Sequence, residues 1–356
     1  MEVNKEICGM LDLMIRPGFC VKENQIIKVN QAAESLLLLP GTDVRTLLLT
    51  GGEEYKAFQS GCLYLKLNLS AKGCGASVTR VDGWDVFVLD QESDDGELRA
   101  MALAARELRE PLTSVMITAD RLFPLASQDD PTAKEQVARL NRGLHQLLRI
   151  IGNMSDAGRC TASSRQETQN IGEFFAEVFE KAQTLVEHTG ITLTYQGLSE
   201  EVLCLADGEQ LERAVLNVLS NAVKFTPKGG TIDATLTRHG WMLRLSVLDS
   251  GSGIAENVRS SVFSRYLRQP GIEDSRYGIG LGMVLIRSAA ANHGGTVLID
   301  QPDGNGTRIT LTMAIRQNPG GVLHSPIMRV DYAGERDHGL IELADCLPAS
   351  VYEKEK

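Results

Sequence analysis

Two asparagines four residues apart are the first residues in this chain whose types and spacing indicate chemistry. Asn217 and Asn221 lie in the segment NVLSNAVKF, where that spacing puts both amides on one helical face. An amide oxygen is a hard, neutral donor, and Mg²⁺ accepts a few such ligands beside phosphate oxygens and water. Lys224, about one turn further on, would add a positive charge near a phosphate. The segment therefore favours a magnesium and phosphate site.

A carboxylate and two glycines follow at the end of a predicted strand. Residues 243–249 alternate apolar and polar side chains and end at Asp249, within the segment LDSGSGI. A carboxylate at a strand end can accept a hydrogen bond from an exocyclic amine such as that of adenine. Gly251 and Gly253 would let the backbone approach such a ligand closely. This pattern favours binding of an adenine-like base.

Two later segments add positive charge and a phosphate-binding backbone. The segment VFSRYLR contains Arg265 and Arg268, which would face anionic groups. A glycine-rich segment then leads into a helix, whose N-terminal N–H groups suit phosphate; its residues of interest are Gly278, Gly280, Leu281 and Gly282. Polar residues 272–276 stand where a dinucleotide-binding motif needs a buried strand, which argues against that motif. Each pattern alone also occurs in ordinary turns and helices, but the order of all four favours one nucleotide site.

The elements that must position these groups alternate between helix and strand across residues 171–316. Predicted helices at 208–225 and 282–293 carry the first and last segments, and His293 is predicted to cap the second helix before Gly294. Neighbouring strands joined by short turns predict an antiparallel or mixed sheet with helices on one face.

Upstream, residues 94–160 show the pattern of two packed helices. Apolar residues step alternately by three and four from Leu98 to Leu122 and again from Val137 to Met154, with a polar turn between. A single hairpin would leave apolar surface exposed, so we expect two copies to pair as a four-helix bundle in a homodimer.

Residues 1–93 are predicted to form a small α+β domain. A strand pair, short helices and three further strands follow one another, separated by Gly and Asp turn signals. This order resembles a PAS domain, although no His or Cys spacing there indicates haem or flavin. Residues 317–356 have no long periodicity, and the sequence does not indicate their role.

Composition limits the compartment and the partners. The formal net charge of −10 argues against nucleic acid as the main partner, because phosphate-backbone binding needs a basic face. Seven scattered cysteines without a CxxC pair favour reduced thiols and argue against a zinc site. No apolar run is long enough to span a membrane or to form a signal peptide, so we expect a soluble cytoplasmic protein.

Together the four segments resemble the N, G1, F and G2 boxes of the ATP-binding domain of sensor histidine kinases. The resemblance covers about 97–316 and implies an α/β sandwich of the Bergerat type at 168–316, a dimerisation hairpin at 94–160, and ATP and Mg²⁺ as cofactors. It implies that Asn221, with Asn217, holds Mg²⁺, that Asp249 reads adenine and that Arg268 contacts phosphate. Residues 255–277 would then be a lid over ATP, and a separate response regulator would be the partner.

The phosphoacceptor position departs from the family pattern. The family's first hairpin helix carries His-Glu-x-x-x-Pro-Leu; here Glu107, Pro111 and Leu112 align, but the histidine is replaced by Arg106. A guanidinium stays protonated and has no free lone pair to attack phosphorus. Phosphorylation at Arg106 by the family mechanism is therefore not expected. His145, on the second helix, is a weaker alternative acceptor, and its simpler interpretation is a solvated helix histidine.

Three functions remain open from the sequence. The first is a sensor histidine kinase family enzyme that binds ATP–Mg²⁺ and signals as a dimer, with no acceptor or an unusual one. The second is an ATP-binding pseudokinase or scaffold that changes a partner without phosphoryl transfer. The third is a Ser/Thr protein kinase of the anti-sigma type, which would not need the paired heptads of residues 94–160.

Overall fold

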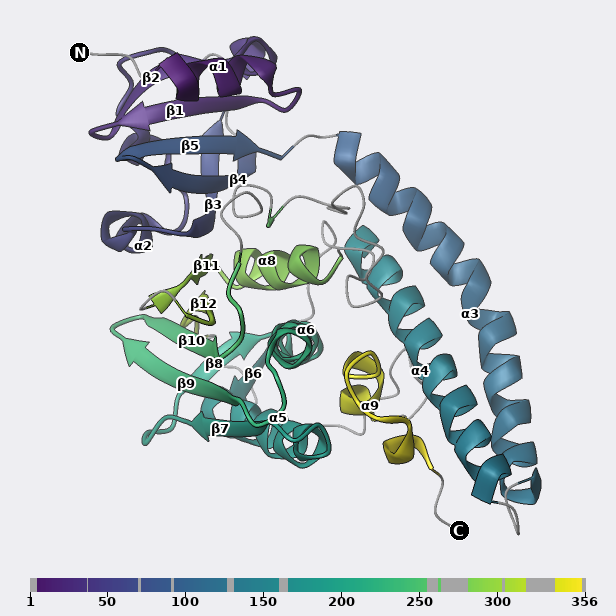
Figure 1. The fold of residues 1–356 in the computed structure, drawn as a ribbon. Coiled ribbons are helices and arrows are strands. Elements are labelled where there is room, and N and C mark those ends of the chain that lie inside the picture. The colour runs from purple at the N-terminus through teal and green to yellow at the C-terminus, as the bar shows by residue number, and fades with distance from the viewer. Residues whose placement is uncertain are drawn as a thin grey trace.

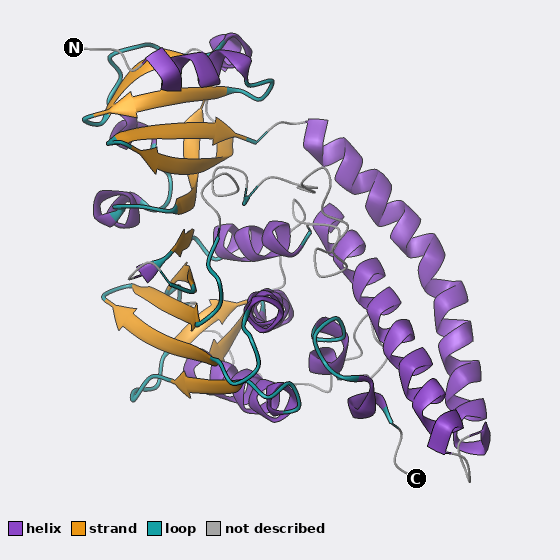
Figure 2. Cartoon of the chain, viewed as in Figure 1, coloured by secondary structure: helices purple, strands orange, loops and turns teal. Residues whose placement is uncertain are grey.

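The computed structural model describes most of the chain. The described residues are 5–36, 38–69, 72–90, 93–126, 131–159, 166–254, 262–263, 281–302, 305–317 and 337–353. None of the described helices is long and apolar enough to cross a membrane. The fold is mixed α and β, with one large sheet, two long helices and several shorter helices (Figures 1 and 2).

The N-terminal part is a five-stranded antiparallel sheet with short helices around it. Its strands run in the spatial order β2-β1-β5-β4-β3. The β1–β2 turn places Glu23 and Asn24 at positive φ, as a tight two-residue hairpin requires. Phe19 and Phe87 stack with ring centroids 4.6 Å apart in the core. The elements are α1 (Lys5–Leu13), β1 (Gly18–Lys22), β2 (Gln25–Val29), η1 (Gln31–Leu36), η2 (Val44–Leu47), α2 (Gly52–Ala57), β3 (Cys62–Leu69), β4 (Lys72–Val81) and β5 (Trp84–Leu89).

Two long helices, α3 (Ser93–Ala126) and α4 (Pro131–Arg159), form an antiparallel hairpin in which α4 lies between α3 and the rest of the chain (Figure 1). Part of the heptad seam is buried between them, where residues such as Ala105 and Leu112 meet Leu144 and Ile151. Five other seam residues remain about half exposed and form what we call the open stripe: Leu108, Val115 and Leu122 on α3, with Leu140 and Leu147 on α4.

The C-terminal part is a sheet with its helices on one face. Strands β11-β12-β10-β9-β7 are antiparallel neighbours except for the parallel pair β7–β9, and β6–β8 form a separate ribbon. Helices α5, α6 and α8 pack their apolar sides onto this sheet (Figure 2). The elements are β6 (Glu167–Asn170), α5 (Ile171–Glu187), β7 (Thr192–Gln196), β8 (Leu203–Ala206), α6 (Gly208–Phe225), β9 (Thr231–His239), β10 (Met242–Asp249), α8 (Gly282–Asn292), β11 (Val297–Asp300), β12 (Thr307–Ala314), α9 (His338–Glu342) and η4 (Ala349–Tyr352).

The two sheets join into one of ten strands, a feature that the sequence did not indicate. Edge strand β3 pairs antiparallel with edge strand β11, with Tyr64 opposite Val297. Beside this junction, the buried Arg287 of α8 donates to Asp90 Oδ1 at 2.9 Å and lies over the Tyr64 ring, 4.9 Å from its centroid. The Tyr64 hydroxyl donates to Asp90 Oδ2 at 2.7 Å. Asp90 comes directly after β5, so this clamp links α8 to the end of the N-terminal sheet.

Candidate functional site

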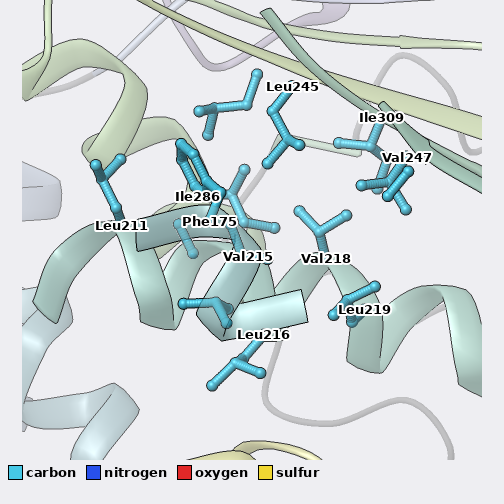
Figure 3. Close-up of a cluster of buried hydrophobic side chains, with 14 of the residues drawn as sticks. Phe175, Leu211, Val215, Leu216, Val218, Leu219, Leu245, Val247, Ile286 and Ile309 are labelled. Atoms are coloured by element: carbon cyan, nitrogen blue, oxygen red, sulfur yellow. The ribbon is translucent and has the colours of Figure 1, made fainter. Parts of the chain in front are cut away.

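Helix α6 carries the first group of candidate residues. The Asp207 side chain caps it by accepting from the Gln210 N–H at 3.1 Å. The apolar side of the helix, including Leu211, Val215 and Val218, packs against the sheet (Figure 3). The polar side chains of Asn217 and Lys224 contact the C-terminal residues instead. The predicted asparagine and lysine thus share the side of α6 turned away from the core.

Asn217 is buried and fully engaged. Its amide nitrogen donates to the Arg213 carbonyl at 2.9 Å and to Glu342 Oε2 at 3.3 Å, and its amide oxygen accepts from Arg149 at 3.3 Å. A Cβ on Gly282 would stand only 3.0 Å from that oxygen, so the start of α8 packs directly against Asn217. The structure therefore brings together the first and last of the four sequence segments.

Asn221 fits a metal ligand better than Asn217 does. It is half-buried, and its side chain makes no hydrogen bond to another described residue, whereas the Asn217 oxygen already accepts from Arg149. Among the described residues there is no cluster of three or more His, Cys, Asp or Glu side chains suited to a metal. An ion at this site would therefore take an amide oxygen together with oxygens from its own bound phosphate or water.

Asp249 is held at the end of β10 as the sequence pattern predicts. It is almost fully buried, and its Oδ1 accepts from the N–H groups of Gly251 at 2.8 Å and Thr307 at 3.2 Å. Burial raises the pKa of this carboxyl, and the two backbone bonds only partly offset that effect. No described residue hydrogen-bonds to Oδ2, which leaves that oxygen as an acceptor for a ligand.

Glycines shape the backbone around Asp249. A Cβ on Gly251 would lie 2.5 Å from the Phe225 carbonyl oxygen, which brings the end of α6 close to this turn. Gly253 has φ +74° and stands against the Gln301 amide. Gly306, which we did not single out from the sequence, has φ +69°, and its Cβ would lie 1.9 Å from the Asp249 carbonyl oxygen. The segment GNGT that contains it was the only available signal, and it looks like any strand turn.

Several predicted site residues cannot be placed. Arg265, Arg268, Gly278 and Gly280 lie outside the described residues, as does most of the expected lid. Leu281 is described and buried, where its side chain packs with Ala157 of α4. Its side chain therefore belongs to the hairpin contact, and only its backbone remains for a ligand.

The hairpin histidine is not where we expected it. His145 is only 5% exposed, so the interpretation of a solvated histidine is wrong. Its Nδ1 bonds to the Asn141 carbonyl at 2.8 Å, and its ring centroid lies 5.0 Å from that of Tyr352, which covers it. Arg106 and Glu107, in contrast, are exposed on α3. A buried imidazole is not open to a bound nucleotide in this arrangement.

The predicted C-terminal cap of helix α8 is confirmed. His293 ends α8, Gly294 follows with φ +72°, and the ring is buried. Nδ1 donates to the Ala289 carbonyl at 2.7 Å, while Nε2 accepts from the Asp207 N–H at 3.0 Å. These two bonds fix a neutral tautomer, and burial lowers the pKa of the ring.

The residues that sequence reasoning missed lie at the C-terminus. Residues 337–353, here called the C-terminal segment, lie between α4 and α6 (yellow in Figure 1). Its fully buried Glu342 pairs with Arg149 and Arg213, and its Asp345 pairs with Lys224 at 3.0 Å. The two residues of each ion pair are far apart in the sequence, so no short sequence motif could indicate the pairing.

Comparison with known proteins gives consistent relatives. Residues 206–317 match the family described as histidine kinase-, DNA gyrase B- and HSP90-like ATPase. Sensor histidine kinase RppB of Synechocystis sp. is 29% identical over 63% of this chain and 50% of its own length. Histidine protein kinase DivJ of Caulobacter vibrioides is 32% identical over 63% of this chain and 38% of its own length. A structure of full-length ShkA with AMPPNP is 24% identical, with a TM-score of 0.49 over 62% of this chain and 47% of that one.

Another relative, hybrid signal transduction histidine kinase D of Dictyostelium discoideum, is 28% identical over 64% of this chain. The chain spans only 15% of the length of that relative and about half of the RppB sequence.

Proposed function

We propose that this chain binds ATP with Mg²⁺ and acts in two-component-type signal transduction, because residues 206–317 match a family of ATPases that includes those of histidine kinases and its relatives include sensor histidine kinases. The observation that carries the proposal is Asp249: a buried carboxylate with one oxygen held by backbone N–H groups and the other left for a ligand. The exocyclic amine of adenine is the donor that this oxygen suits.

The phosphates would lie along α6 toward the start of α8. Lys224 supplies a positive charge there, and Gly282 lets the first turn of α8 approach Asn217 closely. Asn221 would hold Mg²⁺, whose charge would offset that of the bound phosphates. Arg265, Arg268, Gly278 and Gly280 are proposed to complete the phosphate side, on the family resemblance alone.

The chain is further proposed to be a cytoplasmic homodimer with a separate response regulator as partner. The open stripe supports dimerisation, because its residues repeat along both helices and would be covered in a four-helix bundle. For residues 1–93, a strand pair, then short helices, then three strands support the PAS-like interpretation.

Histidine phosphorylation at the family position is not part of the proposal. Arg106 provides no lone pair, and His145 is covered by Tyr352. These two observations favour the pseudokinase alternative, in which nucleotide binding changes the conformation of the hairpin without phosphoryl transfer. The hairpin counts against the Ser/Thr kinase alternative, because a kinase of that type does not need the paired heptad helices.

The test is incubation with γ-labelled ATP, followed by acid and base treatment of any label, with nucleotide binding measured separately. We expect wild type to bind ATP without taking up an acid-labile label, and Arg106→His to acquire one. Arg121→His, the same change at another exposed site on α3, is the matched control and should stay unlabelled. Failure of wild type to bind ATP would refute the proposal, and acid-stable label on an added protein would favour the Ser/Thr alternative.

A further inference from the structure

The C-terminal segment joins the hairpin to the ATPase domain. Ile341 is buried in the hairpin core, while Leu343 and Leu347 are buried in the core of the ATPase domain. Arg142 of α4 donates to the carbonyl groups of Ala344 at 2.9 Å and Asp345 at 3.0 Å. The segment therefore contributes to two cores at once and lies between α4 and α6, which also contact each other directly through Arg149 and Asn217 (Figure 1).

Its acidic side chains neutralise a cluster of buried cations. Glu342, with no exposed surface, accepts from Arg213 at 3.0 Å and from Arg149 at 3.3 Å. Asp345 contacts Arg149 and accepts from Lys224 at 3.0 Å. Burial alone would raise the pKa of Asp345, but the charges of Arg149 and Lys224 hold it below its usual range. The Asp345 carboxylate is therefore charged at neutral pH and acts as an anion toward this cluster.

One cation of this cluster, Lys224, is also the one that the proposed function assigns to the phosphates, and it already binds the C-terminal segment. Asn217, against which the start of α8 packs, binds the same segment. A phosphate close enough to contact Lys224 would stand beside the Asp345 carboxylate, and like charges at that separation repel strongly. The phosphate and Asp345 therefore cannot both pair with Lys224.

We propose that the C-terminal segment is an internal ligand of the nucleotide site, and that the site holds either ATP–Mg²⁺ or this segment but not both at once. The inference rests on the proposed function, because it names a regulator of the same site. With the segment bound, the hairpin is held against α6 and the nucleotide cannot bind. The apparent affinity for nucleotide is then the intrinsic affinity multiplied by the fraction of molecules in which the site is free. With the nucleotide bound, Asp345 leaves Lys224 and the hairpin loses this attachment.

A reversible lock tests the proposal directly. Cys346 Sγ lies 3.5 Å from the Ser220 hydroxyl of α6, so Ser220→Cys would place two sulfurs close enough for a disulfide. Oxidation should weaken binding of a fluorescent ATP analogue by about tenfold or more, within the usual range of coupling between sites. Reduction of the same sample should restore binding. Wild type oxidised in the same way is the control for the other cysteines.

A charge substitution tests the competition without a covalent bond. Asp345→Asn keeps the shape of the side chain but removes the negative charge that pairs with Lys224, and should tighten binding of the analogue by about five- to fiftyfold. Glu353→Gln removes one charge from the same segment at its surface pair with Lys134 and should change binding by less than about twofold. Circular dichroism checks that both variants are folded.

The outcomes separate the two proposals. If wild type, reduced Ser220→Cys and Asp345→Asn all bind the analogue with one affinity, and oxidation changes nothing, the internal-ligand inference is overturned while ATP binding stands. If none of the folded forms binds it, the proposed function fails, and the inference fails with it.

Discussion

The Arg287–Asp90 clamp allows a quantitative test of how firmly the two halves of the sheet are joined. Arg287 is buried, whereas the Asp90 side chain is 24% exposed, so water compensates part of any loss. Removing one partner of a buried ion pair costs about 3–5 kcal/mol, and the partial exposure of Asp90 lowers our expectation for Arg287→Met to about 2–3 kcal/mol. Asp90→Asn keeps one acceptor oxygen for Arg287 but loses the second oxygen, which accepts from the Tyr64 hydroxyl, and should cost about 1 kcal/mol. In a double-mutant cycle the two changes should show a coupling energy of about 1–2 kcal/mol.

Tryptophan fluorescence during urea unfolding isolates the N-terminal side of the junction. Trp84 is buried in that sheet and Trp241 is 69% exposed in the other, so Trp241→Phe leaves Trp84 as the reporter at little cost in stability. Arg238→Met, which breaks the partly exposed pair with Glu200, is the matched control and should cost less than about 1 kcal/mol. A coupling energy below about 0.5 kcal/mol, or an Arg287→Met cost equal to that of the control, would refute a tight junction.

Further predictions concern the site, the dimer and the fold. Asp249→Asn should abolish ATP binding yet shift the unfolding midpoint little, because burial already disfavours the charged carboxyl and raises its pKa; calorimetric titration and thermal melting check both parts. Val115→Glu, in the open stripe, should convert dimer to monomer in sedimentation equilibrium, and an unchanged mass would count against the four-helix bundle. Gly306→Ala should cost more than about 1 kcal/mol in urea unfolding, since the residue has φ +69° and no room for a Cβ. The lowered pKa of His293 means that the unfolded chain takes up its proton first as pH falls, so stability should drop below about pH 6.5, the ordinary histidine value; this drop should be smaller in His293→Gln.

The sequence was most informative where the candidate site depends on short spacings between residues. The amides of Asn217 and Asn221, the strand-end carboxylate of Asp249 and the glycine that begins α8 all lie within local patterns, and the relatives confirm the family resemblance that these patterns indicated. The heptads likewise indicated two packed helices, since an a/d seam is a repeating local signal.

Long-range contacts could not be predicted in the same way. The pairing of Tyr64 with Val297 joins two edge strands, and any apolar edge strand is compatible with many partners. The burial of His145 depends on Tyr352, which follows it by more than half the chain. Glu342 and Asp345 belong to a short segment without periodicity, so only the folded structure shows that they meet Arg213 and Lys224.

The shared ten-stranded sheet also affects how the chain can be divided. Before they pair, β3 and β11 are both edge strands, with unpaired N–H and C=O groups that can template pairing with another chain. In the intact protein each strand protects the other from such association. A fragment that ends at the apparent domain boundary near residue 93 would expose one of these edges, and a fragment that begins at residue 168 would expose the other. Separated halves should therefore associate with themselves, and a dimer observed with either half would reflect the cut edge rather than the open stripe of the hairpin.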